Sequence, residues 1–297
     1  MICINGLRES SALNKANVYP IYAIIVAFNP NIEDFFNNLN NMYSAFNGVL
    51  LIDNSDNYSV SKEVQLRSCK YDNITYKSLS NNGIGAAQNY AVKFLAENKI
   101  YDDILLTFFD QDSYIEKSEV LELADHFIQE KEKDENVVML GATTNSEDGL
   151  SGLTATRHII SSGSITNLSD FEKVGFFDED LFIDFIDFAW CWKAELQGYK
   201  IMVDHDILLH HQTTGNLKKI FGKGIDSPNR LYYVYRNIII SLKRYSDSFS
   251  FSFGWYKHLF VKAVFQLIFA GDKKERCRMI FKGVWHGIKG KSGKYLF

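Results

Sequence analysis

Two carboxylates one residue apart follow an apolar run in this sequence. Asp110 and Asp112 come directly after residues 104–109, whose large and β-branched side chains predict a strand buried on both faces. Open α/β sheets bind their ligands at the carboxyl ends of such strands. Carboxylate oxygens suit Mg²⁺ or Mn²⁺, and either ion could bridge to a diphosphate. Taken alone, the pair is more simply explained as a polar strand end or a helix N-cap.

A second pair of carboxylates, Asp184 and Asp187, lies among aromatic residues. Their spacing of three can place both on one face of a helical turn. Burial among Phe and Trp side chains raises the pKa of a carboxylate and makes it a better general base. Capping of the following helix is the alternative. Because buried acids are costly unless they are paired or used, we favour a functional site.

The polar residues Asn29, Asp53 and Asn82 follow the first three predicted strands, as Asp110 follows the fourth. Loops at the carboxyl ends of parallel strands form one rim, so these side chains can converge without being neighbours in sequence. A crevice lined with acceptors suits a base and a ribose, and Asp53 could accept a hydrogen bond from a pyrimidine N–H. A plain turn after the second strand explains Asp53 equally well.

Gly83 and Gly85 open a predicted helix after the third strand, which imitates a dinucleotide-binding fingerprint. Gln88 stands where the third glycine is required, and the turn belongs to the third strand–helix unit rather than the first. We therefore discount an NAD site. A turn that lets a nucleotide sugar approach the backbone fits better, and simple entry into a helix is the structural alternative.

His210 and His211 stand at the end of the last predicted strand. One imidazole there could contribute to a metal or phosphate site. A zinc site made of histidines alone is not expected, and a purely structural role is equally open.

The elements that must position these residues follow from hydrophobic periodicity. Strands alternating with helices predict an α/β fold with a mostly parallel, Rossmann-like sheet and right-handed crossovers. Residues 145–164 are polar and carry no assignment. The predicted strands are residues 21–28, 48–52, 74–79, 104–109, 137–143 and 201–211, and the predicted helices are residues 31–46, 84–98, 116–133 and 187–198, followed by helical sequence from residue 227.

The composition is that of a globular protein. With 297 residues, 46% of them apolar, the chain can bury a sizeable core, which excludes an intrinsically disordered protein. The four cysteines are far apart and lack metal-site spacing, so we expect reduced thiols. Residues 1–17 lack the apolar segment of a secretory signal. No run reaches the roughly 18 apolar residues of a spanning helix.

Basic residues concentrate in the C-terminal part of the chain. Residues 216–297 contain 17 Lys and Arg and 4 Asp and Glu, a net charge of +13, whereas residues 1–215 carry 15 and 32, a net charge of −17. This asymmetry predicts an anionic partner. Apolar residues beside Lys and Arg favour an interfacial helix on an anionic membrane. A helix packed on the domain with a solvated basic face is the alternative, and no recognised motif supports nucleic acid.

Together these motifs resemble glycosyltransferases of family 2 with the GT-A fold, and in particular bacterial rhamnosyltransferases that build O-antigens and capsules. The resemblance runs from about residue 24 to residue 237. Each landmark is weak alone, and their joint order and spacing make the resemblance specific. The landmarks are Val26-Ala27-Phe28-Asn29-Pro30, Leu51-Ile52-Asp53-Asn54-Ser55, Asn82-Gly83-Ile84-Gly85-Ala86-Ala87-Gln88-Asn89, Phe109-Asp110-Gln111-Asp112-Ser113, Ser162-Gly163-Ser164, Phe182-Ile183-Asp184 with Asp187, and His211.

The resemblance implies roles for these residues. Asp187 matches the catalytic base. The residues that match the site for Mg²⁺ or Mn²⁺ are Asp110, Asp112 and His211. Those that match the nucleotide-sugar site are Ala27, Asn29, Asp53, Asn82, Gly83, Asn89, Asp110 and Gln111. Those that match the acceptor site are Ser162, Gly163, Asp184 and Trp190. Ala189 stands where this branch tends to have an acid, and Lys193 where it tends to have arginine.

The implied activity is an inverting transfer of L-rhamnose from dTDP-rhamnose to a lipid-linked polysaccharide precursor, such as that of O-antigen or capsule. The implied organisation is a GT-A catalytic domain over residues 18–216 and a basic helical region over residues 217–297. The implied location is the cytoplasmic face of the inner membrane, as a peripheral protein. The alternatives are another family 2 transferase that uses a UDP-sugar, such as a galactofuranosyl donor, and a non-catalytic nucleotide-sugar or glycan-binding protein.

Overall fold

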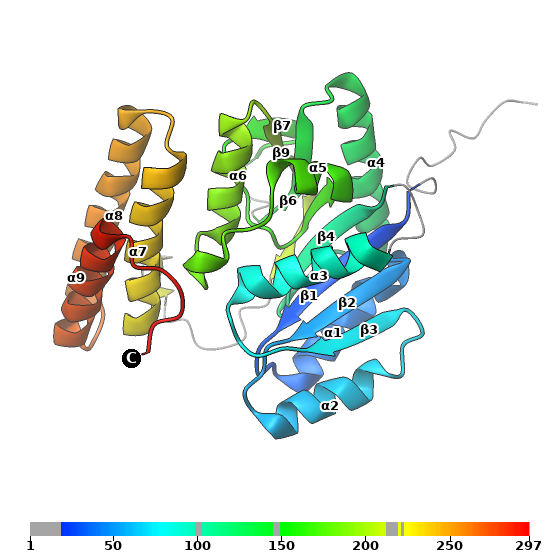
Figure 1. Cartoon of the computed structure of the whole chain (residues 1–297), viewed down its shortest axis with the longest axis horizontal. Coiled ribbons are helices and arrows are strands. Elements are labelled where there is room, and N and C mark those ends of the chain that lie inside the picture. Colours follow the sequence, from blue (N-terminus) through cyan, green and yellow to red (C-terminus); the bar gives the residue numbers. More distant parts are fainter. Residues whose placement is uncertain (1–18, 99–102, 145–148, 212–218, 221–222, 297) are drawn as a thin grey trace, which may run out of the picture.

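The computed structural model describes residues 19–98, 103–144, 149–211, 219–220 and 223–296. An eight-stranded sheet forms its centre, with the strand order β3-β2-β1-β4-β8-β6-β9-β7 (Figure 1). The strands are β1 (Ile21–Ala27), β2 (Gly48–Asp53), β3 (Ile74–Ser78), β4 (Leu105–Asp110), β6 (Val137–Thr143), β7 (Leu153–Thr156), β8 (Ser164–Asn167) and β9 (Lys200–Leu208).

The sheet is parallel in its first half. Strands β3, β2, β1 and β4 pair in parallel, so their carboxyl ends meet at one edge. Strand β8 runs antiparallel between β4 and β6, β6 pairs in parallel with β9, and β7 is antiparallel to β9. The expected α/β class is confirmed, with antiparallel insertions that periodicity does not reveal.

Helices cover both faces of the sheet, because alternate strand residues point to opposite sides. Ile25 of β1 belongs to the core that α1 (Ile32–Met42), α2 (Tyr58–Ser68) and α4 (Lys117–Lys133) cover. Ile24 belongs to the core under α3 (Ile84–Asn98), α5 (Leu168–Val174) and α6 (Ile186–Leu196). Figure 1 shows α3 and α6 in front of the sheet.

Three long helices form the C-terminal region beside α6 (Figure 1). They are α7 (Pro228–Tyr245), α8 (Phe249–Phe269) and α9 (Lys273–Lys289). Helix α9 approaches α7 closely at Gly287, where a Cβ atom would lie 2.9 Å from the carbonyl oxygen of Arg236. Trp192 of α6 packs into the core of α7, so the region is joined to the sheet unit. None of the described helices has the length and apolar composition needed to cross a bilayer.

Most predicted elements are observed, with three kinds of difference. The helix expected over residues 31–46 ends at Met42 and continues as a 3₁₀ turn, Tyr43–Ala45. The last predicted strand is split into β9 and β10 (His210–His211), and β10 pairs with β5 (Ser113–Tyr114). Helices α2 and α5 and strands β7 and β8 were not expected. A hairpin of β11 (Lys219–Ile220) and β12 (Lys223–Gly224) precedes α7.

Some expectations fall on residues that the structure does not describe. Residues 1–17, the proposed boundary between residues 216 and 217, and Cys3 lie outside the described ranges. Cys69, Cys191 and Cys277 are free thiols.

Candidate active site

A cavity of about 880 Å³ opens at the carboxyl end of β4, between the sheet and α7. It combines carboxylates, one arginine and one histidine with apolar side chains. Ligand sites in proteins typically have this size and a few convergent polar groups. The lining residues are Val26, Ile84, Gln88, Asp110, Gln111, Asp112, Ile160, Ser161, Phe182, Ile183, Asp184, Phe185, Ile186, Asp187, Phe188, His211, Ser227, Asn229, Arg230 and Tyr233.

Asp110 ends β4 at the floor of this cavity. Its backbone N–H donates to the Ser162 hydroxyl at 3.1 Å, which fixes the strand end against the neighbouring loop. Burial raises the pKa of Asp110 to about 6, and the negative charge of Asp112 adds to the shift. Burial also raises the pKa of Asp112. The two acids therefore form a site where negative charge accumulates and a cation is favoured.

His211 lies beside Asp112 because β10 pairs with β5. The register sets His211 against Ser113, and its Nδ1 is 2.7 Å from the Ser113 hydroxyl and 3.5 Å from Oδ1 of Asp112. Among the described residues, no three acidic, histidine or cysteine side chains are grouped to hold a metal by themselves.

That donor set still fits Mg²⁺ or Mn²⁺. Magnesium commonly takes only one or two carboxylates from the protein, and substrate phosphates and water complete its coordination. Asp112 and His211 could supply the protein ligands, with Asp110 beside them. The residues present therefore fit a cation that binds together with a diphosphate, rather than a closed structural metal site.

Asp187 stands in the first turn of α6 and lines the same cavity. One carboxylate oxygen accepts from the N–H of Phe188 at 2.8 Å, and the other accepts from the N–H of Ser161 at 3.3 Å. Burial raises the pKa of Asp187 to about 7, helped by the charges of Asp110 and Asp184, although both N–H groups oppose the shift. A carboxylate with such a pKa can take up a proton near neutral pH.

Asp184 is held by an arginine from the C-terminal region. Nε and Nη2 of Arg230 donate to the same oxygen of Asp184 at 3.1 and 3.0 Å. Oδ2 of Asp184 is buried and has no hydrogen-bond partner among the described residues. Burial raises the pKa of Asp184, while Arg230 opposes the shift. Sequence reasoning missed Arg230, because nothing in the local pattern connects it to an acid 46 residues away.

The peptide before Asp187 has an unusual backbone. Phe182, Asp184 and Phe185 all adopt positive φ angles, of 66°, 65° and 65°. Such conformations cost non-glycine residues free energy and persist only where surrounding contacts enforce them. Here the turn presents Asp184 to the cavity and starts α6 at the residue before Asp187.

Two adjacent residues of α7 hold that strained peptide. The amide nitrogen of Asn237 lies 2.9, 2.6 and 2.9 Å from the carbonyl oxygens of Leu181, Ile183 and Asp184. Nη2 of Arg236 also donates to the carbonyl of Leu181, at 2.9 Å. Both side chains are buried. We call Arg236 and Asn237 the α7 anchor.

Gly83 supports the same turn from the opposite side. The N–H of Ile84 donates to the Phe182 carbonyl at 2.9 Å, which brings the start of α3 against this turn. Gly83 has a φ of 106°, and a Cβ atom there would lie 2.8 Å from Cα of Phe182. The glycine turn that imitates a dinucleotide fingerprint therefore allows the start of α3 to pack closely against Phe182.

The expected nucleoside-binding residues lie at the tips of β1 and β2. Asp53 is fully buried and accepts from the Tyr76 hydroxyl at 2.7 Å and from the N–H of Ser55 at 2.9 Å. Asn29, with a φ of 44°, donates through its side chain to Asp56 at 2.6 Å. Gln111 joins these tips to the cavity, because its side-chain oxygen accepts from the N–H of Phe28 at 2.7 Å.

The remaining expected residues are not brought to the cavity lining. Asn89 is buried and exchanges two hydrogen bonds with the backbone of Phe177, at 2.9 and 3.0 Å. Trp190 donates to the Gly175 carbonyl at 2.7 Å from within the core. Hydrogen bonds to neighbouring backbone groups occupy the backbones of Ala27 and Gly163 and the hydroxyl of Ser162. Asn82 is exposed at the surface.

Comparison with known proteins shows the family and the fold of this chain. The chain is 28% identical over 244 residues to the dTDP-rhamnosyl transferase RfbF of Shigella flexneri, which covers 75% of this chain and 80% of the relative. Its fold resembles the structure of GalNAc-T7 with UDP, GalNAc and Mn²⁺, with a TM-score of 0.59 and 12% identity over 91% of this chain. The chain spans 56% of the length of that protein.

A second structural likeness is to the mannosyltransferase PcManGT from Pyrobaculum calidifontis in complex with GDP-Man and Mn²⁺. It has a TM-score of 0.55 and 11% identity, and covers 93% of this chain and 76% of the other. At such identities the two likenesses show the fold alone, and they confirm the GT-A fold. The family model for glycosyl transferase family 2 matches residues 22–185, more than half of the chain. The chain therefore belongs to glycosyl transferase family 2.

Proposed function

We propose that this protein is a metal-dependent, inverting glycosyltransferase that moves L-rhamnose from dTDP-rhamnose to a lipid-linked glycan precursor. One observation carries the proposal: Asp110, Asp112 and His211 line the same cavity as Asp187. A cation-binding group and a carboxylate with a pKa near neutrality then face one substrate space. Rhamnose is the proposed sugar because the curated relative is a dTDP-rhamnosyl transferase.

The reaction follows from the positions of the acids. A hydroxyl oxygen of the acceptor attacks the anomeric carbon of the donor, and the bond from that carbon to the diphosphate oxygen breaks. Asp187 takes the proton of the hydroxyl as the new bond forms. When bound at Asp112 and His211, Mg²⁺ or Mn²⁺ supplies positive charge that stabilises the departing nucleoside diphosphate.

The nucleoside of the donor belongs at the tips of β1, β2 and β3 in this proposal. Gln111 connects the β1 tip to the acid pair, so a molecule held at both places has its diphosphate near Asp112. Both oxygens of Asp53 already have partners, so a pyrimidine N–H would compete with Tyr76 or Ser55. A uracil base offers the same N–H as thymine, and UDP-sugars are therefore compared directly in the assay.

Transfer and hydrolysis measured with dTDP-rhamnose, UDP-galactofuranose and other nucleotide sugars, with and without Mn²⁺, test the function. We expect dTDP-rhamnose turnover that requires the cation. Asp112→Asn weakens Mn²⁺-dependent dTDP binding by about tenfold or more, because a metal ligand loses its charge. Asp187→Asn abolishes turnover but still binds dTDP. Binding of nucleotide sugars without turnover by the wild type would favour the non-catalytic alternative.

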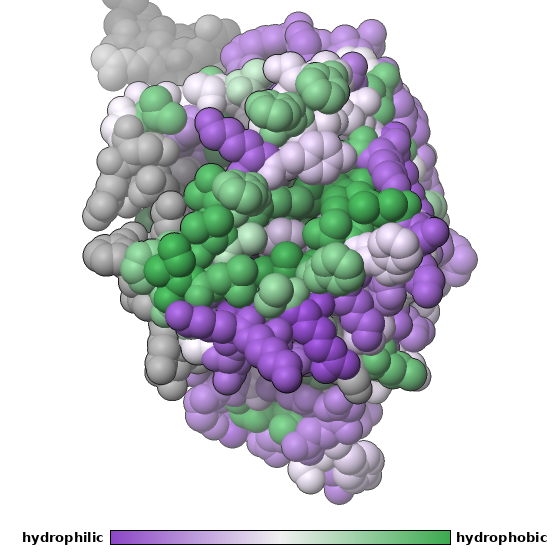
Figure 2. All heavy atoms as spheres, turned by 90° about the vertical axis from the view of Figure 1, so that its left-hand side faces the viewer, coloured by the Kyte–Doolittle hydropathy of each residue, from purple (hydrophilic) through white to green (hydrophobic). Residues whose placement is uncertain are grey.

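The exposed face of α8 and α9 supports a peripheral membrane location. Helix α8 carries Phe253, Phe260 and Ile268 on its surface, 58, 69 and 57% exposed. Helix α9 adds Phe281 and Trp285, 71 and 50% exposed. Figure 2 shows this apolar band, with hydrophilic residues along its border. We call it the α8–α9 face.

The charge of the same region favours an anionic partner. Residues 249–297 contain ten Lys and Arg and two acidic residues. Apolar side chains beside basic ones bind interfaces that contain acidic lipids. We therefore propose that the α8–α9 face lies on the cytoplasmic surface of the inner membrane, where a lipid-linked acceptor is available.

Sedimentation with phosphatidylglycerol vesicles tests this location. We expect the wild-type protein to sediment with vesicles at low salt and less so at high salt. Phe260→Ser and Phe281→Ser together reduce binding, whereas the control Leu66→Ser, which removes an apolar side chain that is 56% exposed on α2, does not. Wild-type protein that stays in the supernatant with these vesicles would refute the location.

A further inference from the structure

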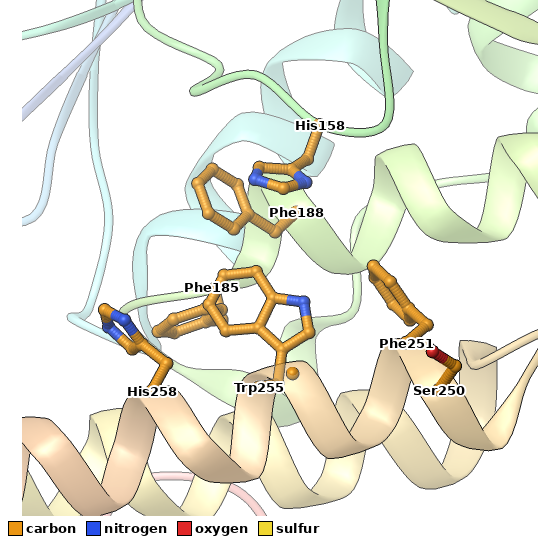
Figure 3. Close-up of a pocket in the computed structure, with 8 residues that line it drawn as sticks. His158, Phe185, Phe188, Ser250, Phe251, Trp255 and His258 are labelled. Carbon is orange, nitrogen blue, oxygen red and sulfur yellow. The ribbon is translucent and has the colours of Figure 1, made fainter.

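A second pocket, of about 550 Å³, lies between the start of α6 and α8. Aromatic side chains from both sides line it, and it is open to solvent (Figure 3). Its volume is within the roughly 300–1,000 Å³ range of small-molecule sites. The lining residues are His158, Phe185, Phe188, Ser250, Phe251, Gly254, Trp255 and His258.

Trp255 connects the two walls of this pocket. Its ring centroid lies 5.5 Å from that of Phe185, 6.1 Å from that of Phe188 and 5.5 Å from that of His158. Burial lowers the pKa of His158, so this imidazole is neutral at physiological pH. The inner surface of the pocket is therefore mainly aromatic carbon and carries no charge at His158.

The pocket adjoins the catalytic cavity. Phe185 and Phe188 line both spaces, and they flank Asp187 in sequence on either side. On the opposite side, Trp255 belongs to α8, whose outer surface contributes Phe253 and Phe260 to the α8–α9 face. The pocket thus lies between the carboxylate proposed as the base and the surface proposed to meet lipid.

We propose that this pocket binds the aliphatic chain of an amphiphilic acceptor, next to the hydroxyl that Asp187 deprotonates. This inference rests on the proposed function, since it names the part of the acceptor that the enzyme recognises. Aromatic side chains favour burial of hydrocarbon, and each buried methylene adds to affinity.

A sugar ring fits the pocket less well than a hydrocarbon chain. Sugar hydroxyls need several hydrogen-bond partners, and buried polar groups left without them are costly. Among the described residues of the lining, the polar groups are the Ser250 hydroxyl, the imidazoles of His158 and His258 and the single N–H of the Trp255 indole, and none of them is a carboxylate. The carboxylates and Arg230 of the adjoining cavity offer the partners that sugar hydroxyls require.

Gly254 provides a way to fill the pocket without disturbing its walls. A Cβ atom at this position would have no neighbour within 4 Å, so a larger side chain enters open space. Replacing a helical glycine also favours the helix itself. Gly254→Trp is therefore the filling variant, and Gly254→Ala is the matched control that leaves the space open.

Binding of octyl β-D-glucoside and methyl β-D-glucoside, both below the micelle concentration, is measured by saturation-transfer NMR titration. The wild type and Gly254→Ala are expected to bind the octyl probe at least tenfold more tightly than the methyl probe. Gly254→Trp is expected to bind both equally. Phe260→Ser, which alters only the α8–α9 face, is expected to keep the preference, and dTDP binding reports that each variant is folded.

Equal binding of the two probes by the wild type, or a preference retained in Gly254→Trp, would overturn the proposal. Loss of the preference in Phe260→Ser would do the same, since the chain would then bind on the outer face. The titration needs neither donor nor turnover. A protein that prefers the octyl probe but transfers no sugar would therefore contradict the proposed function and leave the pocket assignment intact.

Discussion

Replacing Asp187 with asparagine tests the electrostatic cost of the carboxylate proposed as the base. Its pKa is raised to about 7, mainly by burial. The unfolded chain releases this proton near the ordinary aspartate pKa of about 3.9. The native state therefore holds a proton that the unfolded state has lost, and wild-type stability falls as pH rises from about 4 to about 7.

The size of the effect follows from that shift. Three pKa units at about 1.36 kcal/mol each correspond to up to about 4 kcal/mol at pH 8.5. Asparagine removes this cost because it has no charge. Its single side-chain oxygen can accept from only one of the two N–H groups, of Phe188 and Ser161, that Asp187 satisfies. Leaving the other unpaired costs about 1–2 kcal/mol.

We therefore expect Asp187→Asn to be about 2–3 kcal/mol more stable than the wild type at pH 8.5, and about 1–2 kcal/mol less stable near pH 4. Urea unfolding at the two pH values, with a chelator and no donor, measures both differences. The control is Asp170→Asn, which removes a buried carboxylate paired with Lys131 at 2.5 Å and should lower stability at pH 8.5. An Asp187→Asn effect of the same size at both pH values would show that burial does not raise the pKa of Asp187.

Three further predictions follow from the site. Wild-type kcat/KM should rise about tenfold per pH unit below about pH 7 and then level off, because Asp187 must be ionised to accept a proton. A flat kcat/KM profile over pH 5–8 would contradict the role of Asp187 as the base. Asn237→Ala should cost about 2 kcal/mol by leaving the carbonyls of Ile183 and Asp184 unpaired, since the Leu181 carbonyl keeps its bond from Arg236. It should lower kcat more than it changes dTDP affinity, whereas Asn38→Ala, whose buried amide has no hydrogen-bond partner among the described residues, should cost less. Gly83→Ala should lower the melting temperature through its contact with Phe182, and Gly149→Ala, with a φ of 70° and no neighbour within 4 Å, should lower it less.

The sequence predicts the parallel half of the sheet well, because strands β1, β2 and β4 are buried on both faces and read as continuous apolar runs. Asp110 and Asp112 stand at the end of such a run, so topology alone brings them to the rim. Strand β8 was missed, since its residues Ser164 and Thr166 are polar yet buried. Their hydroxyls are satisfied by backbone carbonyls at 2.7 and 2.6 Å, which no sequence pattern reveals.

Prediction of the candidate site from the sequence has a similar limit. Asp184, Asp187 and His211 were expected near Asp110, and all four line one cavity. Asn89 was expected at the nucleotide-sugar site and Trp190 at the acceptor site, but both face the core, because a family resemblance does not say which of the matching residues point outward. Arg230 was missed because it reaches the site through a tertiary contact.

The α7 anchor limits how this protein can be divided. The family model ends at residue 185, but the amide of Asn237 holds the carbonyls of residues 181, 183 and 184. A shortened protein that stops before α7 would leave those carbonyls without their donor and release the strained turn. Chimeras that exchange C-terminal segments between relatives must therefore transfer α7 together with the turn it holds, so that the donors of Arg236 and Asn237 still meet the carbonyls they satisfy here.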